Sequence, residues 1–146
     1  HKIPVSTLIV VHTLDLRVLL IERADAPGDR LSVTGSQEPG ETLAATPARE
    51  LREETGIDAA RYGGVRDWQM SNVYEIYARW RHRYAPGVTH NTEHVFGLEV
   101  PGELAVKVAP REHLSSQWLP WNEAPDRVFS WSNRKAILML PDRKRA

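Results

Sequence analysis

The stretch Gly35–Ile57, GSQEPGETLAATPARELREETGI, places charged and small residues at fixed positions in the chain. Three of its glutamates, Glu50, Glu53 and Glu54, lie within about one and a half helical turns of each other. Carboxylates crowded this closely repel one another unless a cation lies among them. Because hard cations with oxygen ligands serve phosphate chemistry, the stretch predicts a metal site for reactions of phosphates.

The helix in this stretch can begin in two ways, because Pro47 lacks a backbone donor and disfavours helix at the residue before it. Thr46 can cap a short helix with Pro47 at its first position. Alternatively, a helix begins near Thr42 and bends in its first turn. We expect the second arrangement, because Thr42 is a good N-cap and the residues after it favour helix. Gly56 is expected to cap the C-terminus with a positive φ.

Strands are expected around this helix, where β-branched and apolar runs are bounded by turn residues. The expected strands are 5–13, 18–23 (a hairpin with the first), 31–34, 64–70, 73–81, 93–100 and 114–119. A loop is expected at 82–91 and a C-terminal helix at 132–140, ended by Pro141. In the strand expected at 73–81, Tyr74 and Tyr77 face opposite sides, so one of them at most stacks on a ligand ring. Strands surrounding a helix, with a second helix at the end, predict an α/β or α+β sandwich.

Composition narrows the possible function classes. The chain has 146 residues, which predicts one domain over 1–146, and it carries 19 basic and 19 acidic residues. Because these charges balance, no overall electrostatic field attracts nucleic acid or an anionic membrane, and we expect neither as a partner. Arg79, Arg81 and Arg83, at alternate positions leading into the expected loop, do not change this expectation. The sequence has no cysteine, which excludes disulfides and Cys-zinc sites and fits a reducing compartment. Since the start shows no secretory signal and no apolar run is long enough to span a bilayer, we expect a cytoplasmic protein.

Hydrolysis of a phosphoanhydride requires neutralised charge and a positioned water more than covalent help from the protein. Glutamates on one helix can hold Mg²⁺ beside a di- or triphosphate, and Gly35 would let the backbone approach the phosphates. Arg49 is expected to hold Glu41 and Glu53 in place. The alternative is a solvated helix face with i, i+4 salt bridges, which is common for any single glutamate. The whole array of spacings, however, recurs by chance with odds of roughly one in 10⁹ or less.

This stretch resembles the complete Nudix box, through Gly35-x5-Glu41-x7-Arg49-Glu50-Leu51-x-Glu53-Glu54-x-Gly56-Ile57. Pro47 falls where the family usually has Ala. The resemblance implies a Nudix fold, with a mixed β-sheet sandwiched between helices, and hydrolysis of a nucleoside diphosphate linked to another moiety. The positions that serve structure in the motif are Glu41, Arg49, Leu51 and Gly56.

Other segments resemble one Nudix subgroup, the dihydroneopterin triphosphate pyrophosphohydrolases of bacterial folate synthesis, also described as dATP pyrophosphohydrolases. The most specific are RHRYAPGVT at 81–89 and SWSNR at 130–134. This resemblance implies hydrolysis of dihydroneopterin triphosphate to dihydroneopterin monophosphate and pyrophosphate. Two alternatives stay open: a broader pyrophosphohydrolase of the nucleotide pool, acting on dATP or oxidised nucleotides, and a non-catalytic module that binds nucleotides.

The resemblance also implies site residues. Metal ligands are expected at Glu50, Glu53, Glu54 and Glu112, and catalytic residues at Glu53, Glu54 and Glu112. Substrate contacts are expected from Lys2, Arg23, Thr34, Gly35, Tyr74, Glu75, Ile76, Tyr77 and Ser130. The expected cofactor is Mg²⁺, with Mn²⁺ as an alternative. The expected partner is a small-molecule triphosphate that carries a pterin or purine ring, and the oligomeric state is open, with a monomer favoured.

Overall fold

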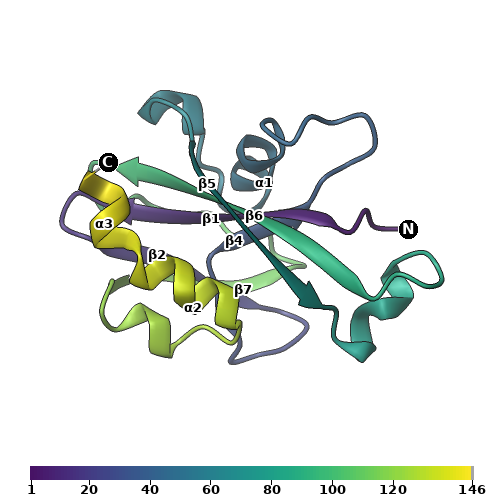
Figure 1. Ribbon diagram of the computed structural model, residues 1–146. Coiled ribbons are helices and arrows are strands. Elements are labelled where there is room, and N and C mark those ends of the chain that lie inside the picture. Colours follow the sequence, from purple (N-terminus) through teal and green to yellow (C-terminus); the bar gives the residue numbers. More distant parts are fainter. Residues whose placement is uncertain (146) are drawn as a thin grey trace.

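The computed structural model describes residues 1–145, in which a sheet lies between helices on its two faces (Figure 1). The strands are β1 (Val5–Thr13), β2 (Arg17–Arg23), β3 (Arg30–Leu31), β4 (Val33–Ser36), β5 (Arg66–Glu75), β6 (His90–Val100) and β7 (His113–Pro120). The α-helices are α1 (Thr46–Thr55), α2 (Trp131–Leu138) and α3 (Leu140–Arg145). Short 3₁₀ helices are η1 (Ala59–Tyr62), η2 (Ala78–Arg83) and η3 (Ala124–Asp126). None of the helices in residues 1–145 combines the length and hydropathy needed to cross a membrane.

The sheet is mixed, which confirms the expected fold class. Its order is β3-β2-β1-β6-β5, with β1 and β6 parallel along their whole length and the other pairs antiparallel. The hairpin strands β1 and β2 meet at His12 and Val18 and then separate. Beyond that point β4 pairs with the first half of β1, and β7 pairs with β2. The separation therefore leaves β4 beside the start of β1, with Gly35 opposite Thr7.

Two apolar cores cover the two faces of the sheet. In β1, Ile9 and Val11 pack on the side of α1, and Leu8 and Val10 pack on the side of α2 and α3. A strand buried on both faces reads as a continuous apolar run, which is why residues 5–13 were predictable. Burial of each large apolar side chain contributes about 1.5–3 kcal/mol to stability. The sheet is thus a rigid support for side chains at its edges.

Helix α1 begins at Thr46, so the expected longer helix from Thr42 was wrong. Pro47 lies in the first turn, where backbone N–H groups have no intrahelical acceptor, so a proline there costs no hydrogen bond. Thr42 stabilises the turn before the helix: its hydroxyl accepts from the Ala45 N–H at 3.2 Å, and its carbonyl accepts from the Thr46 hydroxyl at 3.1 Å. The C-terminal cap was predicted correctly, with φ 75° at Gly56.

Other element boundaries also differ from the expectations. The two strands expected at 64–70 and 73–81 form one strand, β5, with a register shift and a positive φ of 55° at Gln69. Beyond Glu75 the chain turns into η2, and the Ile76 N–H bonds the Thr89 carbonyl at 2.8 Å. Tyr77 therefore does not belong to a strand, and the expected alternation with Tyr74 was wrong.

Two further boundaries depend on side chains distant in sequence or on proline. The strand expected at 31–34 is interrupted at Ser32, whose N–H and hydroxyl bond the side chain of Asn133 at 2.8 and 2.9 Å. The helix expected at 132–140 is divided after Leu138, and Pro141 lies in the first turn of α3 instead of ending the helix. Proline is tolerated in a first turn for the same reason as in α1.

Candidate functional site

A cavity of about 880 Å³ opens where β4, the start of β1, α1, the end of β5 and the start of α2 meet. This volume is typical of a small-molecule site. All of the metal and substrate residues expected from the sequence line it: Lys2, Arg23, Thr34, Gly35, Glu50, Glu53, Glu54, Tyr74, Glu75, Ile76, Tyr77, Glu112 and Ser130. Of the residues expected to serve structure in the motif, Arg49 lines the cavity, whereas Glu41, Leu51 and Gly56 do not.

Glu50 and Glu54 form the buried acidic centre of this cavity. They lie one turn apart on α1, and their side chains are 11% and 5% exposed. Burial, followed by the hydrogen bond and the charge of Glu50, raises the pKa of Glu54 well above its ordinary range. Oε2 of Glu54 has no hydrogen-bond partner among the described atoms.

These two carboxylates fit a hard divalent cation. A buried oxygen without a partner, beside a second carboxylate, is a donor set that such an ion can stabilise. The described part of the chain contains no group of three or more acidic or histidine side chains that is arranged for a metal ion. Glu53 and Glu112 are exposed, and both act on Glu54 through their charge. The structure therefore brings Glu50 and Glu54 together and leaves Glu53 and Glu112 at the rim.

Gly35 makes room for the Glu50 carboxyl. A Cβ atom at residue 35 would lie 2.0 Å from Cδ of Glu50 and 2.2 Å from its Oε1. Real Cβ atoms do not come this close to other heavy atoms. The glycine at the end of β4 is therefore needed so that the acidic centre can approach the backbone.

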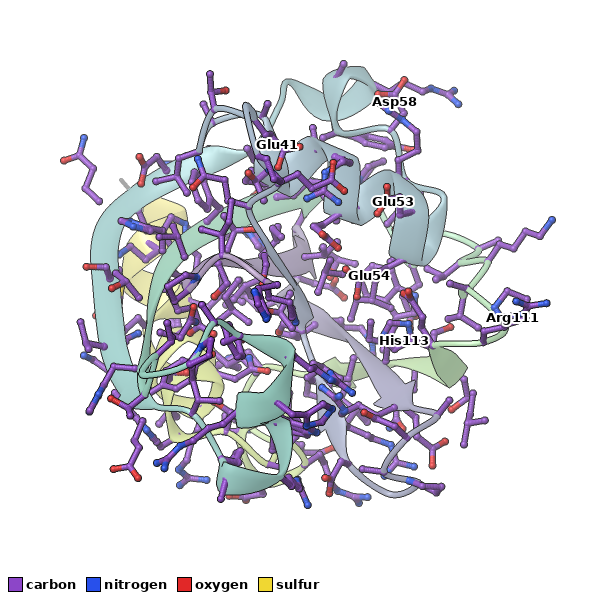
Figure 2. All side chains as sticks on the ribbon, turned by 90° about the vertical axis from the view of Figure 1, so that its right-hand side faces the viewer. Glu41, Glu53, Glu54, Asp58, Arg111 and His113 are labelled. Atoms are coloured by element: carbon purple, nitrogen blue, oxygen red, sulfur yellow. The ribbon has the colours of Figure 1, made fainter. Side chains whose placement is uncertain are left out.

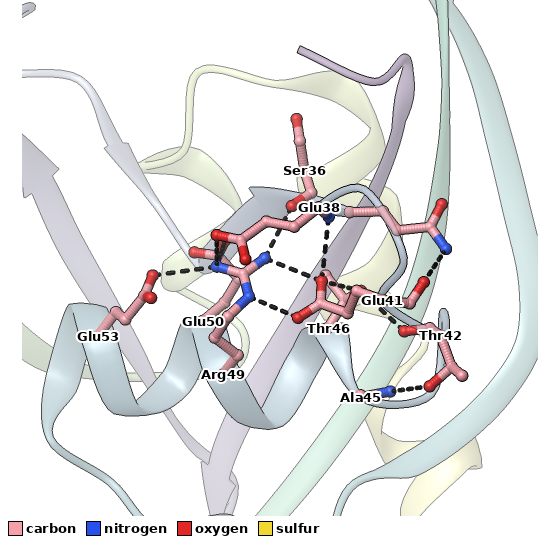
Figure 3. A network of polar contacts seen from close by, with 10 residues as sticks. Ser36, Glu38, Glu41, Thr42, Ala45, Thr46, Arg49, Glu50 and Glu53 are labelled. Atoms are coloured by element: carbon pink, nitrogen blue, oxygen red, sulfur yellow. Dashed lines mark hydrogen bonds and ion pairs between the residues drawn. The ribbon is translucent and has the colours of Figure 1, made fainter.

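Arg49 connects the acidic side chains of α1 with the preceding loop (Figure 3). Its guanidinium donates to Glu41 at 2.6 and 3.1 Å, to Glu50 at 2.8 Å and to Glu53 at 3.0 Å. It also donates to the Ser36 carbonyl at 2.9 Å. The hydrogen bond from Arg49 lowers the pKa of Glu41 to about 2. Arg49 thus fixes the carboxyl of Glu50 within the cavity wall.

The remaining residues of the motif lie away from the acidic centre. Leu51 is fully buried in the core between α1 and the sheet. Gly56 ends α1, and its N–H bonds the Arg52 carbonyl at 3.0 Å. Leu51 thus holds the helix against the sheet, and Gly56 ends the helix.

His113 is a site residue that the sequence did not predict. It begins β7, and its Nε2 lies 3.5 Å from Oε1 of Glu54 (Figure 2). Burial lowers the pKa of the imidazole, and its Nδ1 has no partner among the described residues. A neutral ring can donate to Glu54 and orient it. The one available signal was its place beside Glu112, which lies on the turn before β7.

A cationic cluster lines part of the cavity. The guanidinium of Arg23 bonds Asp25 through two nitrogens, at 2.7 and 2.6 Å, and stacks over Trp80 at 4.6 Å. The Arg83 guanidinium lies 3.6 Å from the Asp25 carboxylate. The backbone N–H of Lys2 donates to the backbone carbonyl of Arg83 at 2.7 Å. Desolvation, then the charges of Arg83 and Arg23, lower the pKa of Lys2. These three cations can hold an anionic ligand.

Aromatic side chains lie beside the cations. Tyr77 is half-exposed and meets Trp80 edge-to-face, with ring centroids 5.3 Å apart. Ile76 is buried, and Glu75 accepts from Arg81 at 2.5 Å. Planar rings can stack against such a group. This part of the cavity can therefore accept the heterocycle of a nucleotide or a pterin.

The polar wall of the cavity is formed by β1, β5 and β6. The Asn91 amide donates to the Ser6 hydroxyl at 2.7 Å and to the Tyr74 hydroxyl at 3.0 Å. Burial, then the charge of Glu93, raises the pKa of Tyr74 to about 12. Burial raises the pKa of Glu93 itself to about 7. The sequence did not predict Asn91 or Glu93 as site residues.

Thr34 and Ser130 complete the lining through local structure. The Thr34 hydroxyl donates to the Thr7 carbonyl at 2.9 Å, which ties β4 to β1. Ser130 is the N-cap of α2, where its hydroxyl accepts from the Asn133 N–H at 3.5 Å. Each hydroxyl therefore already has a hydrogen-bond partner within the protein.

Comparison with known proteins identifies relatives across almost the whole chain. The NUDIX domain family model matches residues 2–140. The dihydroneopterin triphosphate diphosphatase of Escherichia coli is 45% identical over 139 residues, which cover 94% of this chain and 91% of that protein. The protein of the same description from Haemophilus influenzae is 37% identical, over 90% of this chain and 84% of its own. The solved structure of the E. coli dihydroneopterin triphosphate pyrophosphohydrolase superposes with a TM-score of 0.87 at 44% identity, over 94% of each chain.

Proposed function

The chain belongs to the NUDIX family, and we propose that it hydrolyses dihydroneopterin triphosphate to dihydroneopterin monophosphate and pyrophosphate. One observation carries this proposal: the buried Glu50–Glu54 pair lines a cavity that Lys2, Arg23 and Arg83 also line, in a chain 45% identical to a dihydroneopterin triphosphate diphosphatase. A triphosphate matches the cations, and a pterin ring matches the aromatic and polar wall. A cytoplasmic location and a monomeric state stay predictions.

The residues of the chain have separate tasks in this reaction. Lys2 and Arg23 bind the negative charge of the triphosphate, Arg23 through the N–H groups that it does not give to Asp25. Glu50 and Glu54 would hold a divalent ion, which we propose to be Mg²⁺ or alternatively Mn²⁺, with Glu53 and Glu112 as further carboxylates at the rim. When bound, such an ion neutralises phosphate oxygens and makes a water more acidic.

Proton transfer and orientation are assigned to side chains near the acidic centre. Glu112 lies exposed on the turn before β7, where it can accept the proton of the attacking water at a carboxylate oxygen. Glu53 and Glu54 are the other two candidates for this role. His113 orients Glu54, and Arg49 orients Glu50. Positioning of this kind supplies most of the catalysis in phosphoanhydride hydrolysis.

A broader pyrophosphohydrolase is the second candidate. The aromatic group of Tyr77 and Trp80 can stack on any planar ring, including adenine or an oxidised purine. Stacking alone therefore does not select a pterin over a purine. Selection must come from hydrogen bonds to the ring edge.

A substrate panel tests the proposal. With Mg²⁺ present, kcat/KM should be highest for dihydroneopterin triphosphate, above dATP, 8-oxo-dGTP and dinucleoside polyphosphates. Product analysis in ¹⁸O-labelled water should yield pyrophosphate and the monophosphate and show which phosphorus receives the label. A better substrate elsewhere in the panel would support the broader function instead. No turnover of any member with Mg²⁺ or Mn²⁺ would contradict both.

A variant separates catalysis from binding alone. Glu54→Gln should reduce kcat/KM by about 10³-fold or more, because the acidic centre loses a charged ligand. The fold should persist, because a neutral amide avoids both the burial of a charge and the repulsion by Glu50 that raise the pKa of Glu54. Glu123→Gln is the matched control, since Glu123 is exposed and lies outside the cavity. Activity of Glu54→Gln equal to that of Glu123→Gln would show that Glu54 takes no part in catalysis.

A further inference from the structure

Two buried acceptor atoms in the cavity wall have no hydrogen-bond partner among the described residues: Oε1 of Glu93 and Oδ1 of Asn91. The two residues are 4% and 2% exposed, and both line the cavity. Buried polar atoms are almost always paired, because an unpaired one has lost its bonds to water without replacement. Two such atoms in the wall of a ligand cavity indicate that a ligand completes them.

These acceptors lie on the opposite face of the sheet from the acidic centre. Glu93 is paired in register with Ser6, two residues before Leu8 and Val95, which belong to the core under α2. Since side chains alternate along a strand, Glu93 shares the α2 face with them. Glu50, in contrast, reaches Gly35 from α1. The cavity therefore has an acidic end at α1 and a polar end at α2.

The polar end is held in place by its neighbours. The Asn91 amide nitrogen donates to both Ser6 and Tyr74, which leaves its oxygen as a free acceptor in a fixed orientation. The Ser132 hydroxyl, at the start of α2, bonds the Glu93 carboxyl and leaves Oε1 unpaired. Both unpaired atoms accept hydrogen bonds. The ligand that fits them presents adjacent N–H donors.

We propose that Glu93 and Asn91 form a ring-recognition subsite that binds the 2-amino-4-oxopyrimidine edge of the substrate. This inference rests on the proposed function and names the specificity residues of the same site. A pterin or guanine ring offers a ring N–H beside an amino group, and both are donors to a carboxylate. Adenine offers an amino group beside a ring nitrogen that accepts, so it would leave one acceptor unpaired. Sites built on such hydrogen bonds reject analogues strongly.

The first test compares Glu93→Gln with the wild type. The amide keeps the size of the carboxyl but replaces one acceptor by a donor. KM for dihydroneopterin triphosphate should rise about 10- to 100-fold, with kcat changed less than about threefold. The ratio of kcat/KM for dihydroneopterin triphosphate over dATP should fall by at least about tenfold. Inhibition by inorganic tripolyphosphate, which has no ring, should be unchanged.

Glu99→Gln is the matched control, because Glu99 lies on the same strand but outside the cavity. It should leave both the substrate ratio and tripolyphosphate inhibition at wild-type values. Weaker tripolyphosphate inhibition in Glu93→Gln, in proportion to its loss on the substrate, would assign Glu93 a structural role and overturn the subsite. An unchanged substrate ratio would overturn it as well.

The second test uses the wild-type protein and does not depend on hydrolysis. Neopterin and guanosine should shift the side-chain amide NMR signal of Asn91, and adenosine and tripolyphosphate should not. If wild-type protein fails to hydrolyse dihydroneopterin triphosphate but neopterin shifts Asn91, the proposed function falls and the subsite stands. If the substrate is hydrolysed but neopterin leaves Asn91 unmoved, the subsite is wrong and the proposed function stands.

Discussion

At the scale of single residues, the missing side chain of Gly35 decides where the Glu50 carboxyl can lie. In Gly35→Ala the new Cβ would lie 2.0 Å from Cδ of Glu50, so the carboxyl must move. We expect kcat/KM to fall about 10²-fold, as for misplacement by about 1 Å. The free energy of unfolding should change by only about 1 kcal/mol, because a side-chain end moves and not the backbone.

Gly102→Ala is the control for this glycine, since a Cβ there meets no atom within 4 Å. Steady-state kinetics and urea unfolding of both variants measure the two effects. Wild-type activity in Gly35→Ala would show that the position of the Glu50 carboxyl does not matter for turnover.

Glu93 should give the protein a pH-dependent stability. Burial raises the pKa of Glu93 from 4.5 to about 7 in the folded state. Between these values the folded state holds more protons than the unfolded state, so stability falls as the pH rises and stays low above pH 7. The full effect is at most about 3 kcal/mol.

The variant Glu93→Gln has no such titration, so its stability relative to wild type should increase from pH 5 to pH 8. Urea unfolding at these two pH values measures the difference, with Glu99→Gln as the reference. Parallel pH profiles for wild type and Glu93→Gln would mean that Glu93 titrates normally in the folded protein.

At the scale of elements, the ion pairs of Arg49 connect α1 to the loop before it. The hydrogen bond from Arg49 lowers the pKa of Glu41 from 4.5 to about 2, and the Glu41 side chain is 13% exposed. A lowered pKa in the folded state contributes stability above pH 4.5, which is lost as the pH falls towards 2. Glu41→Gln should therefore destabilise the protein at pH 7 by about 1–3 kcal/mol.

The destabilisation by Glu41→Gln should shrink as the pH is lowered, because protonated Glu41 resembles the amide. Chemical denaturation at pH 7 and pH 3 tests this, and Glu103→Gln, whose partner Arg17 lies at 3.4 Å on the surface, is the control. An equal loss at both pH values would assign the effect to packing and not to the ion pair.

Sequence patterns predicted these elements well where the cause is local. The apolar run of β1, the spacing of glutamates on α1 and the positive φ of Gly56 all follow from neighbours in the chain. The boundaries that were wrong depend on distant partners: Asn133 interrupts the strand at Ser32 across 101 residues. Thr42 failed as a cap because the position of Pro47 in the first turn decided where the helix begins.

At the scale of the whole molecule, the site joins two faces of one sheet. The motif predicted the acidic end, because those side chains belong to one helix. It did not predict Glu93 or His113, since each reaches the cavity through strand pairing with residues far along the chain, β6 with β1 and β7 with β2. A lone glutamate or histidine in a strand has no local signal that separates a site residue from a core residue.

The buried acidic centre predicts that a divalent ion stabilises the whole fold. Without an ion, burial of Glu50 and Glu54 beside each other opposes folding, as the raised pKa of Glu54 indicates. An ion that binds only the folded state adds about 2.7 kcal/mol of unfolding free energy at one hundred times its Kd. Added Mg²⁺ should therefore raise the thermal unfolding midpoint, and EDTA should reverse the rise.

Glu54→Gln should unfold at a midpoint that Mg²⁺ does not change, because its acidic centre has lost a carboxylate and its repulsion is already relieved. Glu123→Gln, on the surface outside the cavity, should respond as the wild type does. Calorimetry of the three proteins at matched pH, with and without Mg²⁺, measures this. If Mg²⁺ raises the unfolding midpoint of Glu54→Gln as much as that of the wild type, the stabilising ion binds elsewhere. If Mg²⁺ raises the midpoint of the wild type and of Glu123→Gln but not of Glu54→Gln, the ion that stabilises the fold binds at the acidic centre of the cavity.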